Sequence, residues 1–442
     1  MAPSPPCPPW PAPPRRPTPC DPLSQVFQQV SGAHQLAVGW AVRFRGEPPS
    51  PDTLRRHVRA RLADLPTLTH RVEEGPGSRP CFVSVPELDP REHVHELLMT
   101  DPREQWQSCL QEVLTRPLPA GHRPPWDLWL IHGYGDGTGP PEYVLVFRIH
   151  HALEDGAGHH YVLRTLFTPR IAPQRPRRVA DTPAPAPVES GGRVSFRAVL
   201  GIAGDVAGSL RGSGNWAVLR RPPTGNLATA VGTAATRRLL ALSRALDTDI
   251  SVVFLTALTG AMRAVAVAGE ERPAPLALLW PLTVRTGGER GAVGNYLTMV
   301  RLRLPCAEPL PLRRLASLSR QLEAGRVERR MRTSRALMRR APLPMSLGTL
   351  RLLMRPRHAS LTGTYFPAAL PQPTLGEARL DGALGLGAPL PGQLCHLTLL
   401  RYRSECTLSV VHDTAFARGA DLPELWLAAL AELEAVVRDA RE

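Results

Sequence analysis

The chain has 442 residues, which is too long for one hydrophobic core of ordinary size, so we expect two domains or two halves of a larger unit. Its formal charge of +14 would suit a nucleic-acid or anionic-membrane partner, but all 53 basic residues are arginine. They are scattered, without the interleaved aromatic residues that single-stranded nucleic acids require. We therefore attribute the charge to a GC-rich coding bias, as in actinobacteria, and expect no nucleic-acid partner.

The seven cysteines are widely spaced and form no Cys-x-x-Cys pair, which favours a reducing compartment. The N-terminus lacks the apolar segment of a signal peptide, and no apolar stretch reaches the ~18–20 residues of a membrane span. We expect a cytoplasmic protein that contacts a membrane or lipid-droplet surface at most peripherally.

The N-terminal half mixes helices with a hairpin. Residues 1–20 contain ten prolines and predict a disordered leader. Residues 52–64 and 157–167 have helical periodicity. Between them, residues 127–134 and 142–150 predict a hairpin, and the second strand is so apolar that we expect it to be covered on both faces.

A Pro-, Ala- and Arg-rich stretch divides the chain. We predict an N-terminal subdomain over residues 21–170, a crossover linker over 171–222 and a C-terminal subdomain over 223–442. The stretch 194–221 could form an amphipathic helix against the body of the protein or against lipid, and packing on the body is the simpler interpretation.

The C-terminal half repeats the mixture of helices and hairpins. Its strongest helix is 250–265, with Asp249 as the expected N-cap. A final helix begins at Asp421, which forms a capping-box pattern with Glu424. The glycine-rich run 382–387 predicts a loop. Strands are expected at residues 276–285, 297–304, 396–402 and 406–412.

One motif carries chemistry: His150-His151-Ala-Leu-Glu-Asp155-Gly156, directly after the strand 142–150. A rigid strand end holds a side chain at a cleft, and a histidine there can take a proton from a hydroxyl or amine that attacks a carbonyl. Asp155 could cap the helix that follows or hold an arginine, and Gly156 permits close approach of another segment.

Two other interpretations of this motif stay open from the residues alone. The histidine pair could be a structural feature of a strand end. A metal is a further option, because His151, Asp155 and His159 would share one face if the segment were helical. The buried strand that ends at His150 argues against that helix, so we expect no metal.

The chain resembles the bacterial wax ester synthase/diacylglycerol acyltransferase family, a branch of the condensation-domain and CoA-dependent acyltransferase superfamily that shares the HHxxxDG motif. The motif follows Pro125-Trp126 and a hairpin, as it does in the family. The other similar segments are Leu65–Val72, Gly260–Arg263, Trp280–Arg285, Gly294-Asn295 and Leu304-Pro305. The resemblance covers residues 22–440 and implies an α/β (α+β) fold of two chloramphenicol-acetyltransferase-like subdomains in a V-shaped pseudo-dimer.

The resemblance also implies roles for individual residues. His151 would be the general base, and His150 would support its loop. Asp155 would be structural and pair with Arg285 across the two halves, since a guanidinium fork fixes the orientation of a carboxylate. Asn295 would shape the cleft. The resemblance implies acyl-CoA as a co-substrate and no resident cofactor.

Two segments depart from the family. Ser251-Val252 stand where the family carries Asn-Asp, and Leu361–Pro367 replaces a segment of the Asn-Val-Pro-Gly-Pro type. These changes leave the base in place but put the family's usual substrates in question.

We therefore expect an O-acyltransferase that moves an acyl group from acyl-CoA to a long-chain alcohol or diacylglycerol. One alternative is a stand-alone condensation-type enzyme that acylates a hydroxyl or amine of a specialised metabolite, with an acyl carrier protein as the donor. Another is a non-catalytic scaffold on the same fold.

Overall fold

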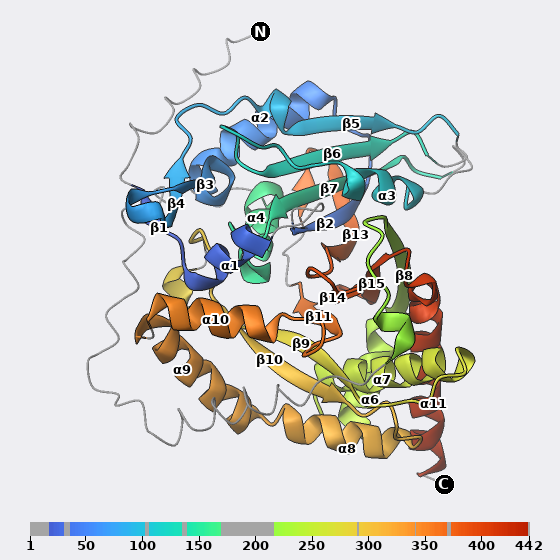
Figure 1. Cartoon of the computed structure of the whole chain (residues 1–442). Coiled ribbons are helices and arrows are strands. Elements are labelled where there is room, and N and C mark those ends of the chain that lie inside the picture. The colour runs from blue at the N-terminus through green and yellow to red at the C-terminus, as the bar shows by residue number, and fades with distance from the viewer. Residues whose placement is uncertain are drawn as a thin grey trace.

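The computed structural model describes residues 17–30, 36–101, 106–134, 139–168, 216–289, 291–340, 342–368 and 373–440; for residues 287 and 336–340 it describes the backbone only. Two six-stranded sheets dominate the fold, the N-terminal one at the top of Figure 1 and the C-terminal one below it. A small third sheet lies beside the N-terminal half, in the order β1 (Thr18–Pro19), β4 (Pro80–Ser84) and β3 (His70–Glu74). The predicted mixed α/β fold is confirmed.

The N-terminal sheet has the strand order β12-β13-β2-β7-β6-β5. Its strands are β2 (Ala37–Arg45), β5 (Val94–Leu98), β6 (Trp126–His132), β7 (Glu142–His150), β12 (Thr374–Leu375) and β13 (Ala378–Gly387). The predicted hairpin is the antiparallel pair β6–β7. Residues 143–147 of β7 are all buried, as expected for a strand covered on both faces.

Helices cover both faces of this sheet. They are α2 (Pro51–Arg61), α3 (Ser108–Thr115) and α4 (Gly156–Phe167), whereas α1 (Pro22–Val30) packs on α10 (Leu343–Leu353) and on strand residues of the C-terminal half. The apolar faces of α2 and α4 share one core with Phe147 and Ile149 of β7, whereas α3 packs with Val144 and Val146 on the opposite face. This alternation along β7 matches the period of two of a strand. It places Ile149, the residue directly before the two histidines, on the α4 face.

The C-terminal sheet has the order β10-β9-β11-β14-β15-β8. Its strands are β8 (Leu227–Ala235), β9 (Leu276–Thr283), β10 (Leu297–Leu304), β11 (Leu361–Pro367), β14 (Cys395–Tyr402) and β15 (Glu405–Asp413). The helices of this half are α6 (Thr236–Ala245), α7 (Ile250–Ala268), α8 (Pro311–Gln321), α9 (Ala324–Arg340), α10 (Leu343–Leu353) and α11 (Leu422–Asp439).

The helix α7 is the centre of the C-terminal core, where it packs against α6, α8 and α11. It is the one described helix that is long and apolar enough to cross a membrane by length and composition, and 78% of its apolar window is buried inside the protein. Its burial extends all round the helix, because Val252, Leu255 and Thr259 are buried as well as the predicted apolar face. Such a helix is the usual core element of a globular half.

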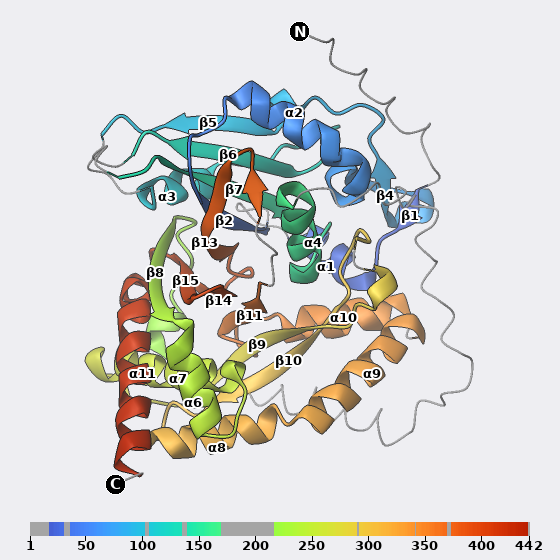
Figure 2. The ribbon, with the colours of Figure 1, turned by 180° about the vertical axis from the view of Figure 1, so that it is seen from behind.

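One segment crosses between the halves, which the sequence did not predict. After β11 the chain leaves the C-terminal sheet, adds β12 and β13 to the N-terminal sheet, and returns as β14 (Figure 2). The run 382–387, expected to be a loop, therefore lies in strand β13 and pairs with β2, Gly385 opposite Trp40 and Gly387 opposite Val38. That expectation was wrong because glycine is depleted in ordinary strands, and these glycines serve close packing instead.

Three smaller expectations also need correction. Residues 17–20 are ordered: Cys20 is buried and its N–H donates to the Pro80 carbonyl at 3.0 Å. Asp249 occupies the N-cap position of α7 but makes no side-chain capping bond. Asp421 precedes α11 in a helical backbone conformation, and its carboxylate accepts from Arg418 at 2.9 Å instead of capping. Most of the predicted linker 171–222 and most of the stretch 194–221 lie outside the described residues. The six described cysteines are buried and form no disulfide with one another.

Candidate active site

The histidine motif lies where β7 ends and α4 begins, at the junction of the two halves. The His151 N–H donates to the Leu36 carbonyl at 3.1 Å and so extends the β2–β7 ladder by one residue. Because side chains alternate along a strand, His151 lies on the same face as Ile149. A rigid sheet edge thereby holds the imidazole in place.

The His151 ring is fixed on two sides. Its Nδ1 lies 2.9 Å from the Glu154 carbonyl oxygen, which can only accept, so Nδ1 carries the proton. The ring stacks on Phe27 of α1 with centroids 4.2 Å apart. Burial lowers the pKa of His151 below its usual value, against the opposing pull of the backbone carbonyls and of Asp155. The neutral ring therefore presents Nε2, which has no hydrogen-bond partner in the described part of the chain, with its lone pair available.

Asp155 both caps α4 and holds an arginine, the two roles that the sequence left open. Its Oδ1 accepts from the backbone N–H groups of Ala157 and Gly158, both at 3.0 Å. Arg285, just after β9 of the other half, donates from Nε to both carboxylate oxygens at 2.8 and 2.9 Å. Burial alone would raise the pKa of Asp155, but the guanidinium and the backbone donors outweigh it and lower the pKa.

The Arg285 guanidinium uses its remaining donors to shape the loop that follows. Nη1 donates to the carbonyls of Glu289 and Ala292 at 2.7 and 3.0 Å, and Nη2 to that of Gly294 at 2.7 Å. The side chain is 4% exposed and lies over the Tyr296 ring. A single residue thus ties this loop to the start of α4, and the loop carries Asn295.

Asn295 connects the same loop to the histidine. Its Nδ2 donates to the His151 carbonyl oxygen at 2.6 Å and to Ser24 Oγ at 3.0 Å. Its backbone N–H donates to Asp21 at 3.0 Å, and Asp21 also accepts from the Ser24 backbone. Asn295 therefore positions the main chain of His151, and its side chain also lies close enough to the imidazole to oppose the lowering of the His151 pKa.

The other two motif residues are structural neighbours of His151. His150 is buried, and its Nδ1 accepts from the Ala152 N–H at 3.0 Å, which supports the turn. Burial and the adjacent His151 ring lower the pKa of His150 to about 4, so it stays neutral. Gly156 lies against Phe366 of β11: a Cβ there would come within 1.8 Å of the ring. Phe366 belongs to the segment Leu361–Pro367, which departs from the family pattern.

The metal alternative assumed that the motif lies within one helix, and the structure shows no such helix. His151 precedes α4, which begins at Gly156, so His151, Asp155 and His159 do not share a helical face. Within the described ranges, no group of three His, Cys, Asp or Glu side chains is placed to hold a metal ion.

Several residues around the base were missed by sequence reasoning. Asp21 and Ser24 carry a local signal, because Asp-Pro-x-Ser is a helix-capping pattern, but nothing in it predicts contact with Asn295. Glu154 is fully buried, with its carboxylate 3.1 Å from His159 Nδ1. Burial and the neighbouring Asp155 raise the pKa of Glu154 well above its usual value, so it is a neutral acid beneath the motif.

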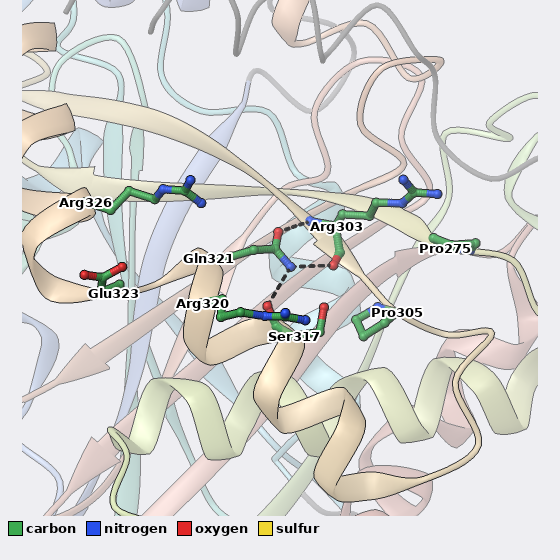
Figure 3. Close-up of a pocket in the computed structure, with 8 residues that line it drawn as sticks. All are labelled: Pro275, Arg303, Pro305, Ser317, Arg320, Gln321, Glu323 and Arg326. Atoms are coloured by element: carbon green, nitrogen blue, oxygen red, sulfur yellow. Dashed lines mark hydrogen bonds between the residues drawn. The ribbon is translucent and has the colours of Figure 1, made fainter.

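A groove of about 700 Å³ lies away from the histidine motif, between α8 and the end of β10 (Figure 3). Three arginines line it, and Gln321 bridges its wall by bonding the backbone N–H and carbonyl of Arg303 at 2.8 and 2.9 Å. It lies where Leu304 pairs with Leu276, the end of the β9–β10 pair opposite to Arg285. It is therefore remote from His151 and is not the reaction centre.

Comparison with solved structures supports the fold. A wax ester synthase/diacylglycerol acyltransferase from Marinobacter aquaeolei VT8 matches at a TM-score of 0.66 and 17% identity, over 95% of this chain and all of that one. The first condensation domain of the calcium-dependent antibiotic synthetase matches at 0.65 and 17%, over 96% and 97%. A trichothecene 15-O-acetyltransferase from Fusarium sporotrichioides matches at 0.62 and 11%, over 95% of each chain. No curated protein matches the sequence.

The sequence profile of the wax ester synthase/diacylglycerol acyltransferase catalytic domain matches residues 23–256, slightly more than half of the chain. The match includes the histidine motif and both strands that hold it. The chain therefore belongs to the wax ester synthase/diacylglycerol acyltransferase family and is an acyltransferase.

Proposed function

We propose that the protein is a cytoplasmic O-acyltransferase that moves an acyl group from acyl-CoA to the hydroxyl of a long-chain alcohol or diacylglycerol, with His151 as the general base. The observation that carries this proposal is the tautomer of His151. The Glu154 carbonyl accepts from Nδ1, burial lowers the pKa of the ring, and Nε2 is left with a free lone pair at the junction of the halves.

The chemistry needs no covalent acyl-enzyme. Nε2 of His151 takes the hydroxyl proton of the acceptor as the acceptor oxygen attacks the thioester carbonyl carbon. The tetrahedral intermediate collapses, the carbon–sulfur bond breaks, and the CoA thiolate takes the proton from the imidazolium. A placed histidine contributes about 10²–10⁴-fold to such a step, and holding both substrates in line contributes much of the rest.

The remaining motif residues act on the base indirectly. Asp155 is saturated by Arg285 and by three backbone donors, Ala157, Gly158 and Tyr296, so it has no free lone pair for a substrate. It holds α4 against the C-terminal half. Together with Asn295, which holds the His151 carbonyl, it fixes the distance between the base and whatever binds on the C-terminal side.

A second candidate function keeps the same base but changes the substrates. Ser251 and Val252 lie in the first turn of α7 where the family carries Asn-Asp, and Val252 is buried, so an amide and a carboxylate are absent from that helix end. The same fold serves as a condensation domain in the antibiotic synthetase. An acceptor that is a specialised metabolite, with the acyl group on a carrier protein, is the alternative that this change favours.

The test measures thiol release from a panel of acyl-CoAs, with long-chain alcohols, diacylglycerol and amines as acceptors, for the wild type and His151→Ala. We expect acceptor-dependent release that falls at least ~10²-fold in the variant. Because the pKa of His151 is lowered, the ring is neutral at pH 7, and kcat/KM should be constant there and fall only as the pH drops well below 6.5.

The outcomes separate the candidates. A best acceptor among the alcohols supports the lipid proposal, and a best acceptor among amines or small metabolites supports the second candidate. Absence of release above hydrolysis from every acyl-CoA would exclude the CoA-dependent reaction, and acyl carrier protein thioesters would then be assayed as donors. Equal activity of a folded His151→Ala variant would remove the histidine from the mechanism.

A further inference from the structure

A third histidine, His396 on β14, faces the N-terminal half. Along β14 the neighbours Cys395 and Leu397 belong to the C-terminal core, whereas Leu400 belongs to the core of the N-terminal half. Side chains alternate along a strand, so His396 lies on the face of Leu400 and points out of its own core. The ring is partly exposed and has no hydrogen-bond partner among the residues that the structure describes.

The position of the His396 ring is set by a glycine. Nε2 lies over Gly387 at the end of β13, where an added Cβ would come within 2.5 Å of it. Gly387 pairs with Val38 of β2, and Val38 pairs with Ile149 of β7. The imidazole therefore lies over the same end of the N-terminal sheet as the motif.

The register also places His396 on the same face of that sheet as His151. Directly paired residues on neighbouring strands share a face, so Gly387, Val38 and Ile149 all point to one side, and His151 is two residues beyond Ile149. The end of β13 is two strands from β7, a separation of about 10 Å between the backbones. The two imidazoles therefore lie near each other over this end of the sheet, and His151 is one of the groups that act on the pKa of His396.

We propose that His396 is a second catalytic residue, which donates a hydrogen bond to the carbonyl oxygen of the acyl thioester while His151 removes the proton of the acceptor. This proposal rests on the O-acyltransferase function above. It supplies a feature that the motif lacks, because His150, Asp155 and Asn295 are all committed to protein partners. It also explains the glycine at 387, which leaves the space that the ring occupies.

The charge state of His396 fits the role. Burial and the neighbouring His151 lower its pKa to about 3, so the ring is neutral throughout the pH range of an ordinary assay. A neutral imidazole keeps one N–H, which can donate to an oxygen on which negative charge develops. Because the ring is neutral, no charge has to be desolvated when it is buried. Its hydrogen bond to the carbonyl oxygen strengthens as the tetrahedral intermediate forms.

The experiment compares wild type with His396→Ala, His396→Asn and Gly387→Ala in the acyl-CoA assay. Loss of one oxyanion donor lowers kcat by about 10²–10³-fold with little change in KM. We expect this loss in His396→Ala and a partial rescue in His396→Asn, which keeps an N–H donor. Gly387→Ala leaves the ring in the protein but displaces it, because the added methyl needs the space of Nε2. We expect Gly387→Ala to lower kcat while the protein stays folded.

The matched control is His132→Ala, whose ring pairs with Glu96 on the far strands β6 and β5 and should leave kcat unchanged. The second measurement does not need turnover: the infrared stretch of a ¹³C-labelled thioester carbonyl in bound palmitoyl-CoA. It should shift to lower wavenumber in wild type and in His151→Ala but not in His396→Ala. Two results overturn this proposal without affecting the role of His151. One is a wild-type kcat in a folded His396→Ala variant, and the other is a carbonyl stretch in His396→Ala that equals that of the wild type. Failure of every acyl-CoA of the panel to bind would instead exclude the CoA-dependent function on which this proposal rests.

Discussion

The two halves are joined along two seams that differ in chemistry. The polar seam is the buried pair of Asp155 and Arg285, with the loop to Asn295 that the guanidinium organises. The glycine seam lies where β13 meets β14: a Cβ at Gly385 would come within 2.4 Å of Thr398, and one at Gly387 within 2.5 Å of His396. The first seam is held by directional bonds and the second by close approach of backbone to side chain.

The two seams have different roles at the site. The polar seam positions the main chain around His151, and its charged groups, Asp155 and Arg285, are bonded to protein partners. The glycine seam does the reverse, because it makes few directional bonds but brings a free imidazole to the sheet edge. A polar seam tolerates little change of chemistry, since breaking a buried pair leaves a charge without its partner. A glycine seam tolerates little change of volume, since close-packed interiors have few voids.

The largest effect is expected from Arg285→Ala in the polar seam. It leaves the Asp155 carboxylate buried without its counter-charge, which costs about 3–5 kcal/mol of the free energy of unfolding. Arg285→Lys should recover only a part, because one ammonium cannot reach both carboxylate oxygens and three carbonyls. Urea unfolding at pH 7 measures both.

The control for this prediction is Arg238→Ala, which breaks the pair with Glu434, where both side chains are about one-third exposed. A pair so open to solvent contributes less than about 1 kcal/mol. If Arg285→Ala costs no more than Arg238→Ala, the polar seam does not hold the halves together in the way described.

An intermediate effect is expected from Gly385→Ala in the glycine seam. The new methyl meets Thr398 Cγ2 at 2.4 Å, and overpacking of this kind costs about 1–3 kcal/mol. Thr398→Ser removes that methyl, so the double variant should be more stable than the sum of the single changes predicts. Gly348→Ala on α10, where the new methyl meets nothing within 4 Å, is the control and should not destabilise. Additive costs in the double variant would contradict the close contact.

Much of the polar seam could be predicted from the sequence. The apolar run 142–150 indicated a strand covered on both faces, and the motif that follows it gave the position of the histidines. The contact between Asp155 and Arg285 came from the resemblance to the family, since 130 residues separate the two in the chain. The capping role of Asp155 came from local chemistry, because a carboxylate before a helical pattern has a short-range partner.

The glycine seam could not be predicted in the same way. Residues 382–387 are read as a loop because glycine disfavours strands, and the reason for these glycines lies in Thr398 and His396 of another strand. The same limit applies to Phe27, which stacks on His151 from a helix more than 120 residues earlier. Local patterns indicate which residues form an element, whereas such contacts depend on which strands become neighbours.

The smallest effect is the change in the pH dependence of stability, which distinguishes two neighbouring carboxyl groups, Glu154 and Asp155. In the folded protein the pKa of Glu154 is raised, so this group keeps its proton at pH values above ~4.5, where the unfolded chain has lost it. The free energy of unfolding that Glu154 contributes therefore falls as the pH rises. Glu154→Gln removes this dependence, so the variant should gain stability relative to wild type as the pH rises from 5 to 8. Asp155→Asn should do the opposite: the pKa of Asp155 is lowered, so its stabilisation is present at neutral pH and disappears only in acid. Thermal unfolding of both variants at pH 5 and pH 8 measures the two effects. If the stability of both variants changes in the same direction, the two carboxyl groups share one environment and Glu154 is ionised in the folded protein.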